Sequence, residues 1–411
     1  MLDVRLMRWV DQLVGTALCS GLAVSKQVTA PLRTSSRPIR KIAVMKFFGL
    51  GSIVVASPSL QALRETYPGA EIIFLTFKAN KEVLEILGLC DRVILIDNSS
   101  LPAFARSTMA AIAELRREGI DLAIDYEFFA KYPLALASLA GIPKKAGFCL
   151  TLEPWRTSLL DFHGYYNHYY HTRDIMLSLV YLLATGDKYY LDFEAWRTRY
   201  AYPTVAPADT DVQRVRELLA AKGFKAGQRL VLLNPNVAAE LAPNTKRWPE
   251  ARYGELATAI CREYPDAFVA FIGAKSEFDY VTRIATTCRS NRVVSTAGEL
   301  SLRELLALLS IAQLFVTNDS GPMHLACLVG TPIVGLFFAE TPTLFAPIGE
   351  HVATVAPNLY SLPMFSVYTG KNTVNLENMP ARAVLVEEAM AQVRKMIAVR
   401  AGAAKPKAAK G

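Results

Sequence analysis

The sequence has no C-x-x-C pair, no zinc-finger spacing, no internal repeat of 20–50 residues and no apolar run long enough to span a bilayer. Its six cysteines are scattered over 411 residues, a distribution typical of reduced, buried thiols and unlike a disulfide framework. The absence of a repeat argues against a solenoid. The short length of the apolar runs argues against a spanning helix, which needs about 20 apolar residues.

A hydrophobic fraction of 52% predicts well-packed globular domains, and a net charge of +8 predicts a surface that attracts anions. Nucleic acid, an acidic membrane surface and a phosphorylated substrate are the anions to consider. The sequence contains no aromatic-basic RNA-binding motif and no compact basic recognition helix. We therefore expect no nucleic-acid partner.

The first 40 residues form a separate segment with an uncharged, largely apolar stretch at 13–24. Its length predicts a helix that lies on a surface and does not cross a membrane. Basic residues flank it on both sides: Arg5, Arg8, Lys26, Arg33, Arg37, Arg40 and Lys41. Two interpretations remain open, namely a helix at the inner face of the cytoplasmic membrane and a helix packed on the protein's own surface.

Short apolar runs alternate with helical patterns in two consecutive series, which predicts an α/β protein with two Rossmann-like doubly wound domains facing a central cleft. We expect an N-terminal domain at 41–205, a C-terminal domain at 206–380 and a C-terminal helix with a basic tail at 381–411. The first expected helix covers 57–67, since Ser57-Pro58 is a typical helix start.

The strongest local signal is the segment 317–332 (TNDSGPMHLACLVGTP), which follows an apolar strand and opens a helix. Asp319 or Ser320 can cap this helix, and Gly321 permits close backbone approach to a ligand. The free amides and the helix dipole favour a phosphate, to which His324 can donate. An ordinary capped helix with a satisfied histidine is the alternative.

A second signal is the segment 233–249 (LNPNVAAELAPNTKRWP), a loop between a strand and a helix. Asn234 lies at its start and Lys246 near its end. A lysine at the mouth of a nucleotide site can offset the charge that develops on a leaving pyrophosphate. The alternative is a solvated loop, and in either case we expect Trp248 to be a packing anchor.

Together these motifs resemble the paired signature of glycosyltransferase family 9, the heptosyltransferases, which reads K-x-W-P and then D-[TS]-G-x-x-H. Lys246 to Pro249 match the first part, and Asp319 to His324 match the second about seventy residues later. Residues 41–70 and 121–148 are similar to the family's opening strand, glycine loop and D-L-x-I-D segment. The resemblance covers roughly residues 41–350.

The resemblance implies a GT-B fold and metal-independent, inverting transfer of heptose from an ADP-sugar to a lipid-linked acceptor, with no cofactor. It implies that Lys246 contacts the donor phosphate and that Asp319, Ser320, Gly321 and His324 line the pyrophosphate and sugar site. It further suggests Glu277 for the ribose hydroxyls. Among the ligand-binding residues we also count those of the glycine loop and of the second segment: Gly49, Gly51, Ser52 and Asn234.

One position departs from the family pattern, because the glycine loop usually carries an aspartate, the general base, where this chain has Ser52. A serine hydroxyl has no useful basicity near neutral pH. Another carboxylate can serve, and Glu127 or Asp125 at the end of a strand are the candidates, although Glu127 also suits an ordinary salt bridge. Alternatively, an acidic acceptor or a dissociative transition state needs only positioning and charge stabilisation, or the protein binds without turnover.

We therefore predict a glycosyltransferase that binds an ADP-sugar, a phosphorylated glycolipid or glycan acceptor, and the inner membrane surface. The main alternative is a catalytically inactive GT-B protein that binds a nucleotide sugar in an envelope-assembly complex. A GT-B sugar epimerase would need paired acid and base carboxylates, which we do not identify. The loop at Gly49 lacks the third glycine of a dinucleotide fingerprint, and the histidines near 163–171 lack partners at metal-ligand spacing.

Overall fold

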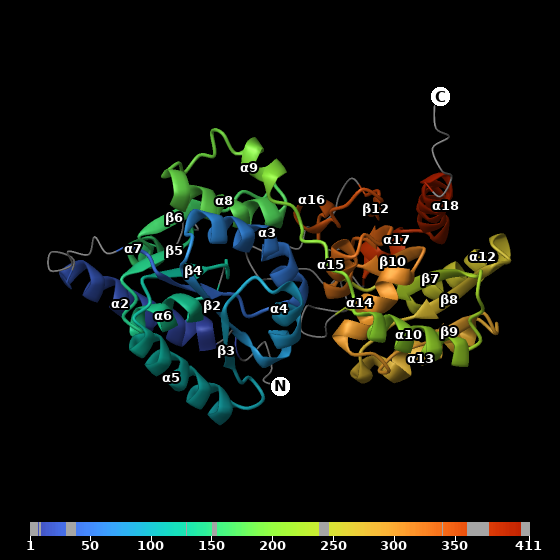
Figure 1. Ribbon diagram of the computed structural model, residues 1–411, viewed down its shortest axis with the longest axis horizontal. Coiled ribbons are helices and arrows are strands. Elements are labelled where there is room, and N and C mark those ends of the chain that lie inside the picture. Colours follow the sequence, from blue (N-terminus) through green and yellow to red (C-terminus); the bar gives the residue numbers. More distant parts are fainter. Residues whose placement is uncertain are drawn as a thin grey trace. The chain divides into compact units, whose positions relative to one another are not determined.

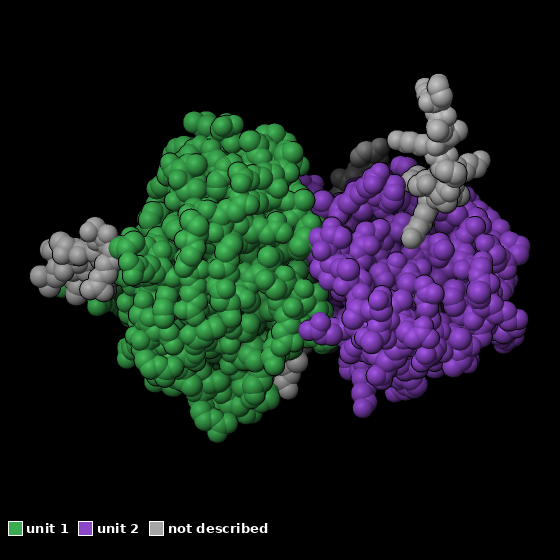
Figure 2. All heavy atoms as spheres, viewed as in Figure 1, with its two compact units in different colours: residues 1–203 green, residues 204–411 purple. Residues whose placement is uncertain are grey.

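The computed structural model of the protein describes residues 7, 10–29, 38–128, 130–149, 154–237, 246–338, 340–359 and 378–403. The chain divides into two compact units, residues 1–203 and residues 204–411 (Figure 2). Each unit is an α/β domain with its own sheet (Figure 1). The basic tail that we predict at 404–411 and the loop residues Asn244 and Thr245 lie outside the described residues.

Unit 1 contains a six-stranded parallel sheet with the strand order β3-β2-β1-β4-β5-β6. Its strands are β1 (Lys41–Met45), β2 (Glu71–Phe77), β3 (Arg92–Ile96), β4 (Leu122–Asp125), β5 (Lys144–Cys149) and β6 (Phe162–Tyr165). Its helices are η1 (Asp11–Gly15), α2 (Thr16–Thr29), α3 (Leu50–Thr66), η3 (Lys78–Asn80), α4 (Lys81–Leu87), α5 (Leu101–Glu118), α6 (Tyr132–Leu139), α7 (Pro154–Leu159), α8 (Thr172–Thr185) and α9 (Glu194–Arg199).

Unit 2 repeats this topology, with the strand order β12-β11-β10-β7-β8-β9. Its strands are β7 (Arg229–Asn234), β8 (Ala267–Phe271), β9 (Val293–Ser295), β10 (Leu314–Asn318), β11 (Ile333–Leu336) and β12 (Val352–Val355). Its helices are α10 (Asp209–Ala221), α12 (Glu250–Glu263), η5 (Lys275–Glu277), α13 (Phe278–Thr287), α14 (Leu302–Ile311), α15 (Gly321–Leu328), α16 (Pro342–Phe345), α17 (Met379–Ala383) and α18 (Val386–Ala403).

The central strands are buried on both faces, which explains their continuous apolar sequences. In unit 1, Ile42 of β1 lies opposite Ile72 of β2 on one side and Leu122 of β4 on the other. The strand order reverses between β1 and β4 in unit 1, and between β10 and β7 in unit 2. Ligands of doubly wound sheets bind beyond the carboxyl ends of the strands at such a reversal.

Helix α3 begins at Leu50, so the predicted start at Ser57 is wrong. Pro58 lies inside the helix, where it has no amide to donate to the carbonyl four residues earlier. The Ser57 hydroxyl donates to that carbonyl, the oxygen of Val54, at 2.6 Å. The Ser-Pro pair is therefore accommodated within the helix, whose N-terminus lies a full two turns earlier in the glycine loop.

Helix α2 packs on its own unit through one face. Cys19 and Ala23 are buried in a cluster with Leu134 of α6 and with Leu159 and Leu160 at the end of α7. The Lys26 ammonium group donates to the Leu159 carbonyl at 2.9 Å and pairs with Asp161 at 2.7 Å. The packed-helix interpretation of this segment thus holds for residues 16–29. Within the described part of the chain, no helix is both long and apolar enough to cross a membrane.

The opposite face of the N-terminal helical segment is apolar and exposed. Val14 is 59% exposed, Val24 61% and Val28 73%. Val10, Leu13 and Leu18 are also exposed. We call these six side chains, of which the first three in chain order lie in or just before η1 and the others in α2, the α2 apolar stripe. A single exposed aliphatic residue is ordinary, whereas six on one helical segment form an apolar surface of the kind that binds a protein or a membrane.

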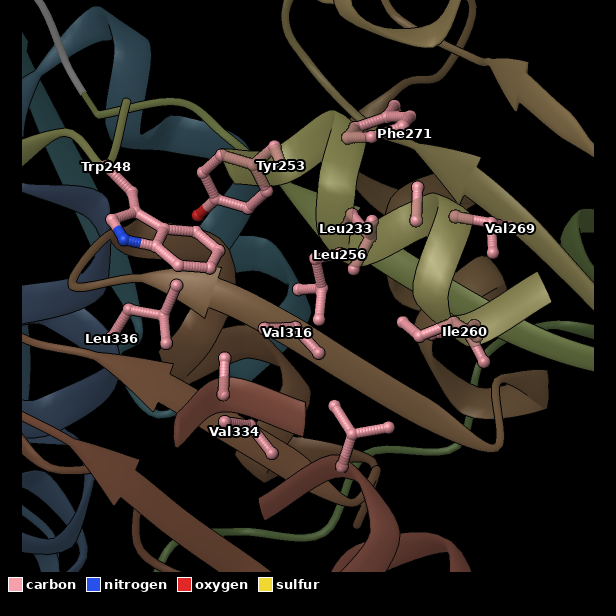
Figure 3. Close-up of a cluster of buried hydrophobic side chains, with 14 of the residues drawn as sticks. Leu233, Trp248, Tyr253, Leu256, Ile260, Val269, Phe271, Val316, Val334 and Leu336 are labelled. Carbon is pink, nitrogen blue, oxygen red and sulfur yellow. The ribbon is translucent and has the colours of Figure 1, made fainter. Parts of the chain in front are cut away.

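Trp248 is the packing anchor that the sequence predicts. It is 1% exposed, and its indole N–H donates to the carbonyl of Val384 at 3.1 Å. Its ring meets Tyr253 edge-on with a centroid distance of 5.2 Å, within the buried cluster of unit 2 (Figure 3). Met390 and Val393 of α18 belong to the same cluster, so the last described helix packs within unit 2.

The YYNHYY sequence at 165–170 is irregular after its first residue, but it lies between two regular elements. Phe162–Tyr165 forms the edge strand β6, and His163 lies in it opposite Gly147 of β5. His171 is the N-cap of α8, and its ring nitrogen Nδ1 accepts the amide of Arg173 at 3.0 Å. This histidine therefore has a structural role at the start of a helix.

Candidate functional site

In unit 2, the predicted ligand-binding residues meet where the strand order reverses. Asn234 ends β7, and Asp319 follows the neighbouring strand β10 directly. Lys246, from the segment between β7 and α12, reaches Asp319 with an Nζ–Oδ2 distance of 2.9 Å. Residues 73 positions apart in the sequence are thus brought into contact at the carboxyl edge of the sheet.

Lys246 is held between two acidic side chains. Glu340, which follows β11, lies 3.8 Å from the Lys246 ammonium group, and all three side chains are nearly buried. Burial alone would lower the pKa of Lys246, but the carboxylates of Asp319 and Glu340 outweigh it and raise that pKa. Burial raises the pKa of Glu340 to about 7. The cluster therefore keeps a charged lysine beside a carboxyl group that accepts a proton readily.

Among the described residues, no side-chain hydrogen bond caps the start of α15. Ser320 is the N-cap residue, but its hydroxyl makes no capping hydrogen bond. It accepts instead from the Asn234 side-chain amide at 2.9 Å and lies 3.1 Å from the hydroxyl of Thr317. The predicted capping role of Ser320 is therefore wrong, because Asn234 and Thr317 hold its hydroxyl. The positive end of the helix dipole is left available to an anion.

His324 lies in α15, 4% exposed, and its Nδ1 atom has no hydrogen-bond partner among the described residues. Burial lowers its pKa to about 4, with Asp319 raising it and Lys246 lowering it further. The ring is therefore neutral at pH 7. A neutral, buried imidazole with an unpaired nitrogen is suited to one hydrogen bond with a ligand.

We expect His324 to make the folded state sensitive to acid. Because its folded pKa of about 4 is below the usual 6.5, the unfolded chain binds the proton first, and stability falls as the pH drops from 6.5 to 4. The full effect corresponds to about 3 kcal/mol. Urea unfolding at pH 7 and pH 4.5 should show the wild type losing more stability than His324→Gln. Equal losses in the two proteins would contradict this assignment.

Glu277 lies at the end of η5, after β8, and its carboxylate accepts the amide of Ala274 at 2.8 Å. Burial raises its pKa. A side chain at Gly273, in the same loop, would come within 2.8 Å of the Asn236 side-chain amide, so glycine is required there. The carboxylate of Glu277 is thus fixed at the edge of unit 2, beyond the strand next to β7.

In unit 1, Glu127 is bound to the loop that follows β1. Its Oε1 atom accepts three hydrogen bonds, from the Lys46 ammonium group at 2.8 Å and from the amides of Phe47 and Phe48 at 2.7 and 2.9 Å. Lys46 is 4% exposed and Glu127 is 8% exposed. The salt bridge that the sequence analysis keeps as an alternative for Glu127 is therefore present, and it lies at the reversal between β1 and β4.

Asp125 ends β4 and is fully enclosed. One of its carboxylate oxygens accepts the amide of Glu127 at 2.8 Å, and the other pairs with Arg156 at 2.8 Å. Arg156 is itself 0% exposed and also donates to the carbonyl of Glu127. Asp125 and Arg156 thus fix the backbone that carries Glu127.

The glycine loop opens α3 without a side-chain cap. Gly49 is the N-cap with φ of 83°, and a Cβ atom there would come within 2.9 Å of the Ser52 hydroxyl. The amide of Ser52 donates to the Gly49 carbonyl at 3.0 Å. Gly51 is buried in the first turn. The close approach of the loop to Ser52 explains why glycine is needed at position 49.

Three residues of these two groups are not among the residues predicted from sequence, namely Lys46, Arg156 and Glu340. Lys46 directly follows the apolar run of β1, so a charged residue at the carboxyl end of a buried strand was the available signal. Glu340 lies four residues beyond the end of β11, so it is not marked by direct succession to a strand. For Arg156, which lies on the short helix α7, the sequence holds no comparable signal.

A model of glycosyltransferase family 9 (heptosyltransferase) matches residues 112–372. The chain belongs to this family. The matched range contains Glu127 in unit 1 and the whole Lys246, Asp319 and His324 group in unit 2. The relationship predicted from the two motifs is thereby confirmed.

Curated members of the family are similar in sequence. Lipopolysaccharide heptosyltransferase 3 of Escherichia coli is 30% identical over 151 residues, which are 37% of this chain and 41% of that relative. The same-named protein of strain K12 is 23% identical over 309 residues, covering 74% of this chain and 83% of the relative. The first match therefore spans less than half of the relative's length.

Solved structures of the family share the fold. ADP-heptose lps heptosyltransferase II of E. coli has a TM-score of 0.68 at 17% identity, with 88% of this chain and 99% of that chain covered. The family 9 glycosyltransferase of Veillonella parvula has a TM-score of 0.71 at 18% identity, with 89% and 100% covered. These matches confirm the GT-B fold of two parallel six-stranded sheets with helices. In the described ranges, no group of three or more His, Cys, Asp or Glu side chains could hold a metal ion.

Proposed function

We propose that this heptosyltransferase-family protein moves a heptose from ADP-heptose to a lipopolysaccharide-type acceptor, with inversion and without a metal ion. The observation that carries the proposal is the start of α15, where the described residues provide no side-chain cap and no partner for the His324 Nδ1 atom, and where Lys246 pairs with Asp319. A solved relative, the E. coli heptosyltransferase WaaC, has been obtained with ADP, which supports this donor class.

The donor is assigned to unit 2. The helix dipole of α15 and the Gly321 backbone favour the diphosphate, and Lys246 offsets the charge that develops on the leaving ADP. Asp319 orients Lys246 through its 2.9 Å contact, and His324 donates one hydrogen bond as a neutral imidazole. Asn234 holds Ser320 in place, and we assign the ribose hydroxyls to Glu277.

The acceptor is assigned to unit 1, with Glu127 as the general base. In this step Glu127 takes the proton of the acceptor hydroxyl, the acceptor oxygen bonds to the anomeric carbon, and the bond from that carbon to the ADP oxygen breaks. Both oxygens of Asp125 are hydrogen-bonded, so we give it the role of positioning Glu127 through Arg156. Gly49, Gly51 and Ser52 shape the loop that Glu127 holds.

The direct test is incubation of the purified protein with ADP-heptose and a deacylated lipopolysaccharide core oligosaccharide. Mass spectrometry should show the acceptor gaining one heptose, and NMR of the product should show the anomeric configuration inverted. Chelation of metals should leave the rate unchanged. A product with retained anomeric configuration would refute inversion. Loss of activity with chelator, and its recovery when a divalent cation is added, would refute metal independence.

The second candidate function is binding of a nucleotide sugar without turnover. Ser52 favours it, because a hydroxyl stands in the first turn of α3 where the family usually has a carboxylate. Under this alternative, ADP-heptose binds tightly and neither transfer nor donor hydrolysis occurs. The transfer experiment above separates the two functions.

We further propose that the α2 apolar stripe rests on the inner face of the cytoplasmic membrane, where a glycolipid acceptor is found. Its six aliphatic side chains face away from the core of unit 1, and the chain carries a net charge of +8, which favours an anionic surface. Removing the whole N-terminal segment would also uncover the cluster around Cys19, so substitutions on the stripe are the cleaner test.

We expect Val14→Glu combined with Leu18→Glu to reduce binding to vesicles of anionic phospholipid by at least tenfold, since two charges would enter the interface. The matched control is Gln12→Glu combined with Thr16→Glu, which adds the same charge at exposed positions outside the stripe. Co-sedimentation with vesicles measures the bound fraction. Equal loss in both variants would show that charge alone matters and would count against the stripe.

A further inference from the structure

Unit 1 contains a cavity of about 290 Å³ that the proposed chemistry does not use. It lies among the end of β6, the first turns of α8, and the segment from 187 to 197 that includes α9. Its aromatic lining consists of Tyr165, Tyr170, Tyr189, Tyr190 and Phe193. The size is near the lower end of the range of roughly 300–1,000 Å³ for small-molecule sites.

The polar lining of this cavity is fixed by buried charges. The Asp174 side chain is 2% exposed and pairs with the Arg197 guanidinium group, with an Nε–Oδ2 distance of 3.1 Å. It also accepts a hydrogen bond from Arg173 at 2.7 Å. The Arg197 side chain stays 43% exposed and also lies 3.4 Å from the Glu194 carboxylate, so it presents a partly exposed charge between two carboxylates of the lining. A charged pair whose geometry is set in advance can recognise hydroxyl groups with little reorganisation.

The aromatic wall is accessible, and one of its residues has an unusual backbone conformation. Tyr170 is 48% exposed and Tyr165 is 43% exposed. Tyr190 adopts φ of 62°, a left-handed conformation that a bulky residue rarely takes. The Asp187 carboxylate holds it there by accepting the amides of Tyr189 and Leu191, each at 2.8 Å. Such an outlier persists where the surrounding contacts impose it, and it often marks a ligand site.

The cavity lies at the same edge of the sheet as the Lys46 and Glu127 pair. Tyr165 is the last residue of β6, and all strands of this sheet run parallel, so their carboxyl ends share one edge. Packed rings link the two places, because Phe128, the neighbour of Glu127, meets Tyr166 with a centroid distance of 4.6 Å. The cavity therefore lies at the same edge of the sheet as the part of unit 1 to which we assign the acceptor, and the packed Phe128 and Tyr166 rings lie next to both places in the sequence.

We propose that this cavity is a saccharide-binding subsite, which holds a sugar residue of the acceptor other than the one that receives the heptose. A sugar ring has an apolar face of C–H groups and a rim of hydroxyls, which matches a wall of tyrosine rings beside the Asp174 and Arg197 pair. This inference rests on the proposed function for its ligand, and it assigns acceptor recognition to residues 165–197.

The test measures binding of a deacylated, heptose-containing core oligosaccharide to the full-length protein by calorimetry, with no donor present. We expect Tyr170→Ala to weaken binding about tenfold, the loss of one stacking contact, and Tyr170→Phe to bind as the wild type does. Tyr169→Ala is the matched control, since Tyr169 is 76% exposed and does not line the cavity. Thermal melting confirms that all three variants fold.

In the transfer reaction, Tyr170→Ala should raise KM for the oligosaccharide about tenfold while leaving kcat and the KM for ADP-heptose unchanged. If Tyr170→Ala behaves like Tyr169→Ala in both measurements, or if the oligosaccharide does not bind to the wild type, the subsite is refuted. If the oligosaccharide binds in a Tyr170-dependent way but no transfer is seen, the proposed function fails and the subsite stands.

Discussion

Lys246→Met is expected to lower kcat/KM for ADP-heptose by about 10²- to 10³-fold, the effect of removing one charge-stabilising donor from a buried site. Methionine keeps much of the length of the lysine side chain and removes only its charge. The variant leaves the Asp319 and Glu340 carboxylates close together. The fold should survive this change, because the pKa of Glu340 is already raised to about 7 and that group can take up a proton.

The control for this variant is Lys225→Met, an exposed lysine of the same unit. Steady-state kinetics with varied ADP-heptose, alongside thermal melting, should show loss of transfer in the Lys246 variant and normal transfer in the control. A Lys246→Met enzyme within threefold of the wild type would remove this residue from the donor site.

Glu127→Gln is expected to lower kcat by about 10²- to 10⁴-fold, the range for loss of a general base. Glutamine retains an oxygen that can accept the amides of Phe47 and Phe48, so the loop after β1 should keep its position. The substitution removes the negative charge that pairs with Lys46. It also removes the carboxylate that would take the proton of the acceptor hydroxyl, so turnover should fall. Calorimetry should show ADP-heptose binding to this variant as tightly as to the wild type.

Glu114→Gln provides the comparison, because Glu114 is a surface partner of Arg92 in the same unit. Its kcat should be unchanged. If Glu127→Gln turns over at the rate of the wild type, Glu127 is a salt bridge only, and the base lies elsewhere or is not needed.

Much of the fold was predictable because the buried strands carry continuous apolar runs. The runs KIAVM, RVILI and LAID predict strands at 41–45, 92–96 and 122–125, and these are the bounds of β1, β3 and β4. The edge strands β6 (FHGY) and β12 (VATV) were missed, since edge strands are short and need little apolar sequence. The start of α3 was misplaced because a Ser-Pro pair usually opens a helix, and only the structure shows the Ser57 hydroxyl replacing the missing amide bond.

The candidate site was predictable where the sequence places polar residues after strands. Lys246 and Asp319 could be assigned together from their motifs, and the structure shows them in contact. Glu340 and Lys46 could not be assigned, because a single charged residue after a strand does not reveal its partner. No periodic pattern in the sequence predicts the tyrosine-lined cavity, because its wall depends on the left-handed backbone conformation at Tyr190.

The measurement closest to the central claim is calorimetric titration of the protein with ADP-heptose, a UDP-sugar and a GDP-sugar, repeated with Lys246→Met. The account predicts that ADP-heptose binds with one site per chain, that the other two sugars bind at least tenfold more weakly, and that the variant loses affinity for ADP-heptose. Equal affinity for all three nucleotide sugars would contradict a sugar-diphosphate site at the start of α15. An unchanged affinity of Lys246→Met for ADP-heptose would contradict it as well.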